Sequence, residues 1–310
     1  MALGTNHVTK TTADKFIPEI WSDEIVAAYK ANLVAANLFS KMSFKGKKGD
    51  TLHIPKPTRG SASAKAASSQ VTLIAATESE VQVLINKHYE YSRLIEDIVE
   101  TQALSSLRRF YTDDAGYALA TQVDTDLIQL GRAVGTGTAY STAAASTNAF
   151  IGSTGATVYN STTSNAAALG DAGIRRSIQR LDDADVPMSD RFLIVPPTTR
   201  NTLMGLARFT EQSFTGEAAG GNTIRNGQIG DVYGVKVYVS TNADTAAGNS
   251  ATDRICLLAH KDAFVLAEQM GVRSQTQYKQ EYLGTLFTSD MLYGVAELRD
   301  SSAVALAVPA

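Results

Sequence analysis

The sequence predicts an α+β protein in which a long extended segment comes before one long helix. Three features indicate this arrangement. Residues 43–91 join a basic stretch to a tract of small residues and end in an alternating run at 81–89, which is typical of a strand. Residues 98–134 carry large apolar side chains at helical spacing. From residue 171 onward, short helical stripes alternate with β-rich runs, so helices and sheets share the remaining chain.

The composition fits a globular protein with a substantial core. The chain has 310 residues, 44% hydrophobic and 19% charged, and a net charge of −3. A nucleic-acid coat is disfavoured, because neutralising phosphates requires a surplus of Lys and Arg. We expect no signal peptide in the polar residues 1–15 and no membrane span anywhere. Cys256 lies in an apolar run, which predicts a buried thiol. Because it is the single cysteine, no disulfide can form within one chain, which fits synthesis in a reducing cytoplasm.

Residues 1–42 read as an N-terminal arm that packs on another surface. A polar tail leads into Trp21, Ile25, Tyr29 and Leu33, whose spacing near 3.6 residues predicts a helix. Trp21 is the only tryptophan of the chain. Because tryptophan often anchors interfaces, we regard Trp21 as a candidate intersubunit contact, with a role in the core as the alternative.

The extended segment is strongly basic near its start, and between residues 41 and 65 its only acid is Asp50. One interpretation is a solvated loop kept soluble by its lysines. The other is an electrostatic docking surface for an acidic neighbour. An isolated two-stranded ribbon is marginally stable in water, so we expect the partner of this segment on another copy of the chain. The candidate intersubunit contacts in it are Lys45, Lys47, Lys48, Lys56, Arg59 and Lys65.

The predicted helix over 98–134 would reach roughly 50 Å at 1.5 Å per residue. Glu96 and Asp97 at its start and Arg132 near its end agree with the helix dipole. Residues 138–169 are rich in Ser, Thr, Ala, Gly and Asn and have few large apolar side chains. We therefore expect a surface insertion there, with a short hairpin near residues 150–159.

From residue 171 onward, local sequence patterns predict a series of helices and strands. Ile174, Ile178 and Leu181 predict a helix that ends at a Val-Pro pair, and a buried strand follows at 191–195. Pro196 and Pro197 then open a second helix. The further strands expected are at 232–239, 254–259, 263–269, 272–278, 293–299 and 303–308.

The sequence contains no recognisable catalytic motif. The four histidines show no metal-ligand spacing, and neither a phosphate-binding loop nor a nucleophile elbow occurs. Asp182, Asp183 and Asp185 could hold a cation, but a helix end before a proline turn is the simpler interpretation. We therefore predict no catalytic, cofactor-binding or metal-binding residue, and a structural role for the protein.

Three stretches carry a resemblance to a known family. They are the helix, Val-Pro turn and strand at 179–197, the Gly-rich lead into a strand at 227–240, and the run at 291–306. In these stretches and in overall order the chain resembles the major capsid proteins of tailed double-stranded DNA bacteriophages, which have the Hong Kong 97 type fold. The implied order is an N-terminal arm at 1–42, an extended β-hairpin loop at 43–91, a peripheral domain with a long spine helix at 92–137, a low-complexity insertion at 138–169, an axial domain at 170–270 and return strands of the peripheral domain at 271–310.

The resemblance implies a shell protein that self-assembles into hexamers and pentamers of an icosahedral capsid enclosing double-stranded DNA, without sequence-specific binding. It implies a portal protein, possible decoration proteins, no cofactor and no membrane. Because the sequence does not begin with the long helical segment of some members, we expect a separate scaffolding protein. The alternatives are an encapsulin-like compartment, an α/β enzyme built on 171–270 and a secreted surface-layer subunit.

Overall fold

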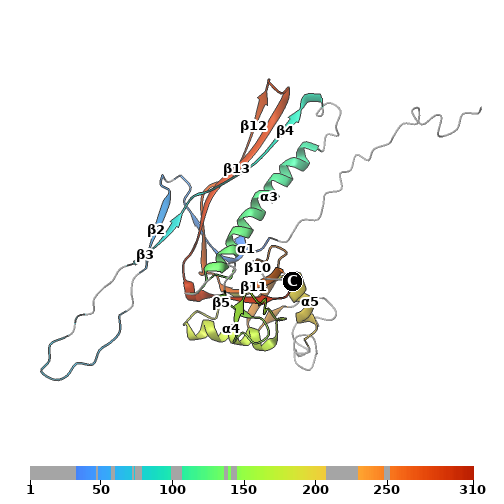
Figure 1. The fold of residues 1–310 in the computed structure, drawn as a ribbon. Helices are drawn as coiled ribbons and strands as arrows, with labels where there is room; N and C mark the ends of the chain where they lie inside the picture. The colour runs from blue at the N-terminus through green and yellow to red at the C-terminus, as the bar shows by residue number, and fades with distance from the viewer. Residues whose placement is uncertain are drawn as a thin grey trace, which may run out of the picture.

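The computed structural model describes residues 33–46, 48–56, 60–71, 73, 79–98, 107–135, 139–140, 145–206, 230–247 and 252–310. Three candidate contacts, Trp21, Lys47 and Arg59, lie outside these residues, as does the helix predicted around Trp21. In the described ranges the chain forms a four-stranded sheet, an eight-stranded sheet and a separate two-stranded hairpin, with one long helix beside the first sheet (Figure 1).

The four-stranded sheet forms a long arm. Its strand order is β1 (Ser40–Ser43), β12 (Phe264–Lys279), β13 (Gly284–Glu297) and β4 (Lys87–Glu96). Because β12 has 16 residues and β13 has 14, the pair is roughly 50 Å long. The helix α3 (Leu107–Gln129) runs along this arm and continues into the 3₁₀ turn η2 (Leu130–Ala133) (Figure 1). It buries the predicted stripe of Ala115, Leu119, Val123 and Leu127.

The eight-stranded sheet has two strands, β7 and β14, that are covered on both faces. Its order is β6 (Val158–Asn160), β5 (Ala145–Ile151), β14 (Ala303–Val308), β11 (Thr252–His260), β7 (Arg191–Val195), β9 (Val235–Val239) and β8 (Asp231–Val232), with β10 (Thr245–Ala247) paired to β11. Every residue of β7 and β14 is buried. That pattern suits a strand covered on both sides, where apolar residues run continuously instead of alternating.

Two apolar clusters cover the two faces of this sheet. On one face, Phe192 and Leu257 pack in a cluster with Leu119 and Leu127 of α3. On the other, Leu193 packs in a cluster that includes residues of α4 (Asp171–Asp183) and α5 (Pro197–Met204). The predicted helix after residue 171, the strand at 191–195 and the proline-opened helix are therefore confirmed.

The hairpin consists of β2 (Thr51–Lys56) and β3 (Ser79–Leu84), which pair with each other in an antiparallel register from Thr51 opposite Leu84 to Lys56 opposite Ser79. It projects away from both sheets (Figure 1). The pairing of the two strands within one chain confirms the predicted β-hairpin, and the expectation that the hairpin packs on another copy stays a prediction. Beyond these strands, the described residues 60–71 and 73 are all exposed.

Four expectations require correction. Residues 271–310 do not form return strands of one domain, since β13 lies in the four-stranded sheet and β14 pairs with β11 in the middle of the other. Glu96 ends β4 and does not begin the long helix. The strand expected at 263–269 continues through residue 279, so the boundary placed at residue 270 falls inside β12.

The segment 138–169 is the fourth correction, because it belongs to the body and is not a surface insertion. The short hairpin predicted in it is confirmed as β5 and β6, but β5 also pairs in parallel with β14. Tyr140 and Tyr159 are fully buried. Gly173 of α4 crosses this segment so closely that a Cβ atom there would overlap the carbonyl oxygen of Gly152. The small residues that suggested low complexity therefore permit close backbone packing.

Candidate intersubunit interface

The root of the hairpin is fixed to the four-stranded sheet. Val83 packs in a small buried cluster with Val265 and Ala267, against which Leu52 and Ile54 are partly buried. One hydrogen bond adds to this contact, since Gln269 Nε2 of β12 donates to the Gly49 carbonyl at 3.0 Å. A second bond, from the Ile85 amide to the Asp50 carbonyl at 2.7 Å, closes the base of the hairpin itself. The root is thus held in one orientation, which a projecting ribbon needs if it is to reach a defined target.

Gly294 of β13 permits the closest contact between the hairpin and the arm. A Cβ atom at this position would overlap the carbonyl oxygen of Leu84, at the end of β3, and would lie 3.1 Å from Ile85 Cα. Any larger residue at 294 would push the hairpin root away from the sheet. The direction in which the hairpin leaves the body therefore depends on a glycine in the neighbouring sheet.

The distal hairpin is exposed throughout its described residues, 60–71 and 73. Most are Ser, Ala or other small polar residues, but two large apolar side chains interrupt the tract. Leu73 is 90% exposed and Val71 is 66% exposed. Single exposed apolar side chains are ordinary on a folded surface, but these two lie in the distal part of a projecting ribbon, where every described residue is exposed. They are available for contact with another molecule.

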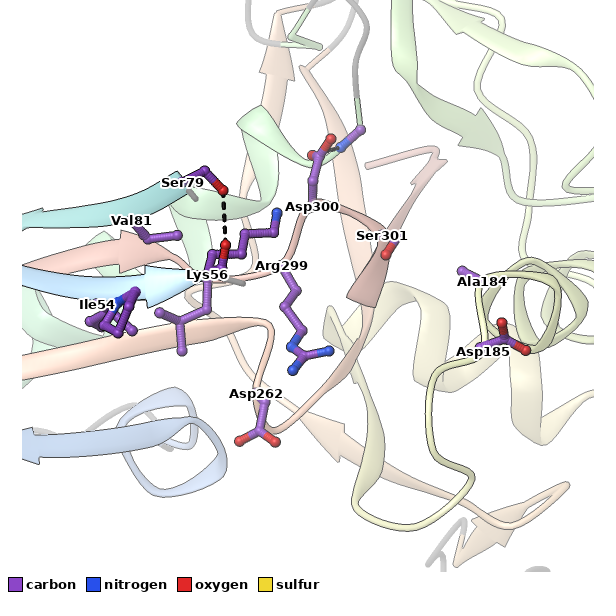
Figure 2. Close-up of a pocket in the computed structure, with 13 residues that line it drawn as sticks. Ile54, Lys56, Ser79, Val81, Ala184, Asp185, Asp262, Arg299, Asp300 and Ser301 are labelled. Carbon is purple, nitrogen blue, oxygen red and sulfur yellow. Dashed lines mark hydrogen bonds between the residues drawn. The ribbon is translucent and has the colours of Figure 1, made fainter. Parts of the chain in front are cut away.

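A groove lies between the hairpin root and the body, and we call it the root groove. It has a volume of about 1050 Å³. Lys56 lies at one side of it, near the corner that joins β13 to β14, and Asp185 lies across the opening (Figure 2). Its lining residues are Ile54, Pro55, Lys56, Ser79, Val81, Gly135, Ala184, Asp185, Asp262, Leu298, Arg299, Asp300 and Ser301.

Beside this groove, Glu297 and Asp300 form a carboxyl pair. Burial and the neighbouring Asp300 raise the pKa of Glu297 to about 7, against a smaller opposing effect of the Lys56 ammonium. Glu297 Oε1 is buried and has no hydrogen-bond partner among the described residues. Asp300 accepts a hydrogen bond from the Gly135 amide at 2.6 Å. The charge at the groove therefore changes with pH near neutrality.

The far end of the arm exposes a second apolar surface. The exposed fractions are 60% for Ile98, 63% for Tyr282 and 66% for Leu283. Leu283 also has a φ of 43°, in the left-handed region that disfavours a side chain of its size. Its carbonyl accepts the Asp97 amide at 2.9 Å, which fixes the turn against the end of β4. A strained, exposed leucine at the end of an arm points to a contact surface.

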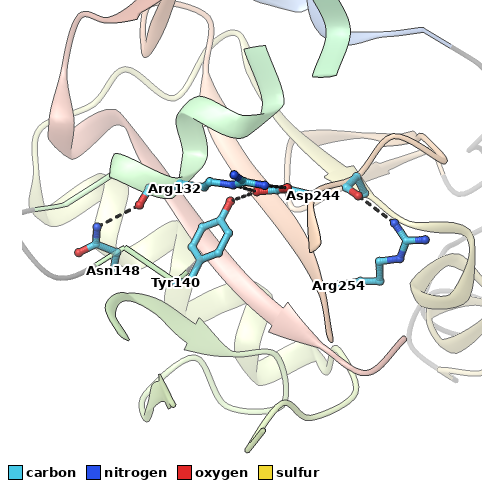
Figure 3. Close-up of polar contacts among 6 residues, drawn as sticks. Arg132, Tyr140, Asn148, Asp244 and Arg254 are labelled. Carbon is cyan, nitrogen blue, oxygen red and sulfur yellow. Dashed lines mark hydrogen bonds and ion pairs between the residues drawn. The ribbon is translucent and has the colours of Figure 1, made fainter. Parts of the chain in front are cut away.

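A buried polar network connects the long helix to the eight-stranded sheet. Arg132 in η2 donates two hydrogen bonds of 2.7 Å to the Asp244 carboxylate, and the Tyr140 hydroxyl donates a third at 2.9 Å (Figure 3). The Arg132 carbonyl accepts from Asn148 Nδ2 at 3.2 Å. Burial and the Asp244 charge hold the pKa of Tyr140 well above its usual value, so its hydroxyl remains a donor. The network fixes the helix end on the body.

Two carboxylates on the same helix bind neighbouring segments. Asp124 accepts the Val34 and Ala35 amides at 3.0 and 2.6 Å, at the start of the short helix α1 (Ala35–Leu38). Asp126 accepts the Tyr293 hydroxyl at 2.7 Å and pairs with Lys87 at 3.0 Å. Neither was singled out from the sequence, because the acids of a long helix give no local sign of which side is buried.

The lysines predicted as intersubunit contacts lie in different settings. Lys45 pairs with Glu268 of its own chain at 3.1 Å, Lys56 lines the root groove, and Lys48 and Lys65 are exposed. The structure therefore does not gather them into one patch. The apolar residues Val71, Leu73, Tyr282 and Leu283 were missed, and only their isolation among small or polar neighbours could have pointed to them.

The predicted buried thiol is confirmed. Cys256 is fully buried in β11, and burial raises the pKa of its thiol to about 12. In the described ranges, no group of three His, Cys, Asp or Glu side chains could hold a metal ion. No helix among the described residues is long and apolar enough to cross a membrane.

The long arm with its helix, the separate sheet domain and the projecting hairpin define a shell subunit of the Hong Kong 97 type. Solved phage capsids share this fold. The Mycobacterium phage Che8 structure matches with a TM-score of 0.74 and 23% identity over 94% of this chain and 97% of that one. The capsid of cyanophage P-SCSP1u matches with a TM-score of 0.73 and 19% identity over 99% and 96%. The capsid of cyanophage Pam1 gives 0.71 and 13% over 99% of both chains.

The model of the phage capsid protein family matches residues 93–305, and the chain belongs to that family. It is a structural major capsid protein of a tailed phage, and its location is the virion capsid. No curated protein matches the sequence. The alternatives of a compartment subunit and of an enzyme built on 171–270 are not favoured by these matches.

Proposed function

We propose that copies of this chain assemble into hexamers and pentamers, and that these close into an icosahedral shell around packaged double-stranded DNA. The observation that carries the proposal is the hairpin, which projects from the body (Figure 1). It is fixed at its root and carries exposed Val71 and Leu73 in its distal part. A segment of this kind is stabilised by contact with another copy. In a closed symmetric assembly, each contact repeats, so a modest free energy per subunit accumulates.

We assign the domains according to the sheets. The four-stranded sheet with α3 is the peripheral domain, whose exposed tip meets other copies. The eight-stranded sheet is the axial domain, and it includes the segment 145–160 and β14. The root groove lies where the hairpin joins these two parts.

The basic residues of the hairpin steer the neighbour into position. Lys48 and Lys65 are exposed, and the same segment holds Lys47 and Arg59. Exposed charges of this kind change the rate and specificity of association more than its affinity. Trp21 is the corresponding anchor of the N-terminal arm.

We infer the contents of the shell and its other partners from the class of phage capsid proteins. The net charge of −3 suits a wall that does not hold the genome tightly. A separate scaffolding protein directs closure, a portal protein occupies one vertex and a decoration protein can bind outside. The subunit is made in the host cytoplasm.

Electron microscopy of the purified full chain, expressed with and without a candidate scaffolding protein, tests the proposal. Closed shells, or hexameric and pentameric rings, are expected. A monodisperse monomer under both conditions would overturn it. A matched pair of variants separates charge from fold: Lys65→Glu should slow assembly at low salt while leaving the melting temperature unchanged, and Lys65→Arg should behave as the native chain.

A further inference from the structure

The outer end of the paired hairpin strands lies beside the joint between the two sheets. The strands β2 and β3 pair out to Lys56 opposite Ser79, and both of these residues line the root groove. The same groove is lined by Gly135, which follows the long helix, and by Asp300 in the 3₁₀ turn η3 (Asp300–Ser302) between β13 and β14. The hairpin, the end of the helix and the link between the sheets therefore meet at one place.

At this joint, a pair of carboxyl groups holds the end of the long helix. Asp300 accepts the Gly135 amide at 2.6 Å, and Glu297 forms a hydrogen bond with Asp300. A bond between two carboxyl groups requires one proton, because two carboxylates can only accept. Protonated Glu297 supplies it, since burial and the Asp300 charge raise the pKa of Glu297 to about 7. Glu297 Oε1 is buried without a partner among the described residues, so loss of the proton places a charge there with no donor.

Lys56 is placed to neutralise that charge. Its side chain is exposed and is directed toward Asp300 (Figure 2). It acts on Glu297 through its charge across the groove. Arg299, which also lines the groove, is directed toward Asp262 and away from Asp300 in the same view. Because Coulomb attraction grows as charges approach, a second carboxylate at the joint draws Lys56, and with it the hairpin, toward the body.

Further ionisable groups lie around the groove or on the hairpin, and most of them have partners of their own. They are Asp185, Asp262, His260, His53 and Glu80. Asp262 accepts the Ser40 hydroxyl at 2.7 Å, and its amide donates to His260 Nδ1 at 3.1 Å. His53 pairs with Glu80 on the hairpin itself at 3.0 Å. Histidine is the other side chain that changes charge near neutral pH, so a test must separate His53 from Glu297.

We propose that Glu297, Asp300 and Lys56 form a pH-sensitive latch that sets the angle of the hairpin on the body. With Glu297 protonated, its hydrogen bond to Asp300 holds the joint, and Lys56 stays exposed at the groove. With Glu297 ionised, Lys56 moves toward the two carboxylates, the groove narrows and the hairpin tilts about its fixed root. The latch lies within one chain, so it operates before any other copy is bound.

Pulsed electron paramagnetic resonance of the unassembled full chain, with two spin labels, tests the latch. The labels are attached at Ser63→Cys in the exposed distal hairpin and at Met188→Cys on the body, where the native side chain is 76% exposed. The native Cys256 is fully buried and does not take up label. Because an extended chain rises about 3.4 Å per residue, Ser63 lies beyond Lys56 and amplifies the tilt, and the mean distance should shift by about 3 Å or more between about pH 5.5 and about pH 8.5.

Three variants assign the shift to the latch. Glu297→Gln can still donate to Asp300 but cannot ionise, so it should keep the acidic distance at both pH values. Lys56→Met removes the cation and should abolish the shift. Its matched control is Lys48→Met, on the same exposed segment but outside the groove, which should retain the shift. Circular dichroism establishes that each variant is folded, and the exposed Lys56 keeps the test decisive if Glu297→Gln does not fold.

The inference is overturned if the distance in the native background does not change with pH, or if Lys56→Met and Lys48→Met shift equally. A shift that persists in Glu297→Gln would assign the movement to His53 and would overturn it as well. None of these measurements requires assembled particles. Failure of the latch and failure of the proposed shell function are therefore distinguishable.

Discussion

Replacing Asp244 by Ala should destabilise the protein more than the loss of any exposed ion pair. The Asp244 side chain is 4% exposed and accepts three hydrogen bonds, two from Arg132 at 2.7 Å and one from Tyr140 at 2.9 Å. Removing it leaves the fully buried Tyr140 hydroxyl without its acceptor and Arg132 without its counter-ion. The Asp244 carbonyl still accepts the Ile255 amide at 2.9 Å, so the local backbone hydrogen bond survives.

The size of this effect follows from the burial of the partners. Breaking a buried ion pair by removing one partner costs about 3–5 kcal/mol. The Arg132 side chain is 34% exposed, so water recovers part of its solvation, and we expect a loss of about 2–4 kcal/mol. Tyr140→Phe removes only one hydrogen bond and should cost about 1 kcal/mol.

Urea unfolding of the unassembled protein, followed by far-UV circular dichroism, measures these losses. The matched control is Arg175→Ala, which breaks the exposed Asp171–Arg175 pair at 3.0 Å and should cost less than about 0.5 kcal/mol. The reasoning is refuted if Asp244→Ala and Arg175→Ala give unfolding free energies within about 0.5 kcal/mol of each other.

Three further predictions follow from single contacts. Gly173→Ala should destabilise the chain by about 1–3 kcal/mol or block folding, because its Cβ atom would overlap the Gly152 carbonyl; Gly116→Ala, with nothing within 4 Å, should be neutral or stabilising in the same melts. Glu297 retains its proton in the folded state up to a pKa of about 7, so the free energy of unfolding should fall as pH rises between about 4.5 and 7. Glu297→Gln should flatten that slope and stabilise the protein at pH 8 by about 1–2 kcal/mol after allowance for solvent screening, and an unchanged pH profile would contradict the assignment. Gly294→Ala should shift the hairpin root and lower assembly several-fold while the arm stays folded, which hydrogen exchange of β2 and β3 amides would report; full protection there would count against it.

Local patterns in the sequence predicted those elements whose environment is set within a few residues. The helix stripe of Ile174 and Leu181, the continuous apolar strand β7 and the proline at the start of α5 each carry their own signal. The long helix was recognised from its stripe, but Glu96 was interpreted as a charge at its start, because an acid before a helix and an acid at a strand end look alike.

Sheet membership could not be read from the same patterns. The six apolar residues of β14 would fit the centre of either sheet, and only the pairing with β11 assigns them to the larger one. Residues 145–160 looked peripheral because they hold few large side chains, yet Tyr159 is buried and Gly152 contacts α4 closely. The root groove joins residues from the hairpin, from the turn after α4 and from the corner after β13, which are far apart in sequence.

The claim that assembly depends on the projecting hairpin can be tested most directly by shortening it. Residues 57–78 are replaced by Asn-Gly, because Lys56 lies opposite Ser79 and a two-residue turn can close that register. The native and shortened chains are then compared by electron microscopy under identical assembly conditions, with circular dichroism to establish that both are folded. The account predicts closed shells from the native chain and only folded, unassembled subunits from the shortened one. Shells of normal size and yield from the shortened chain would contradict it.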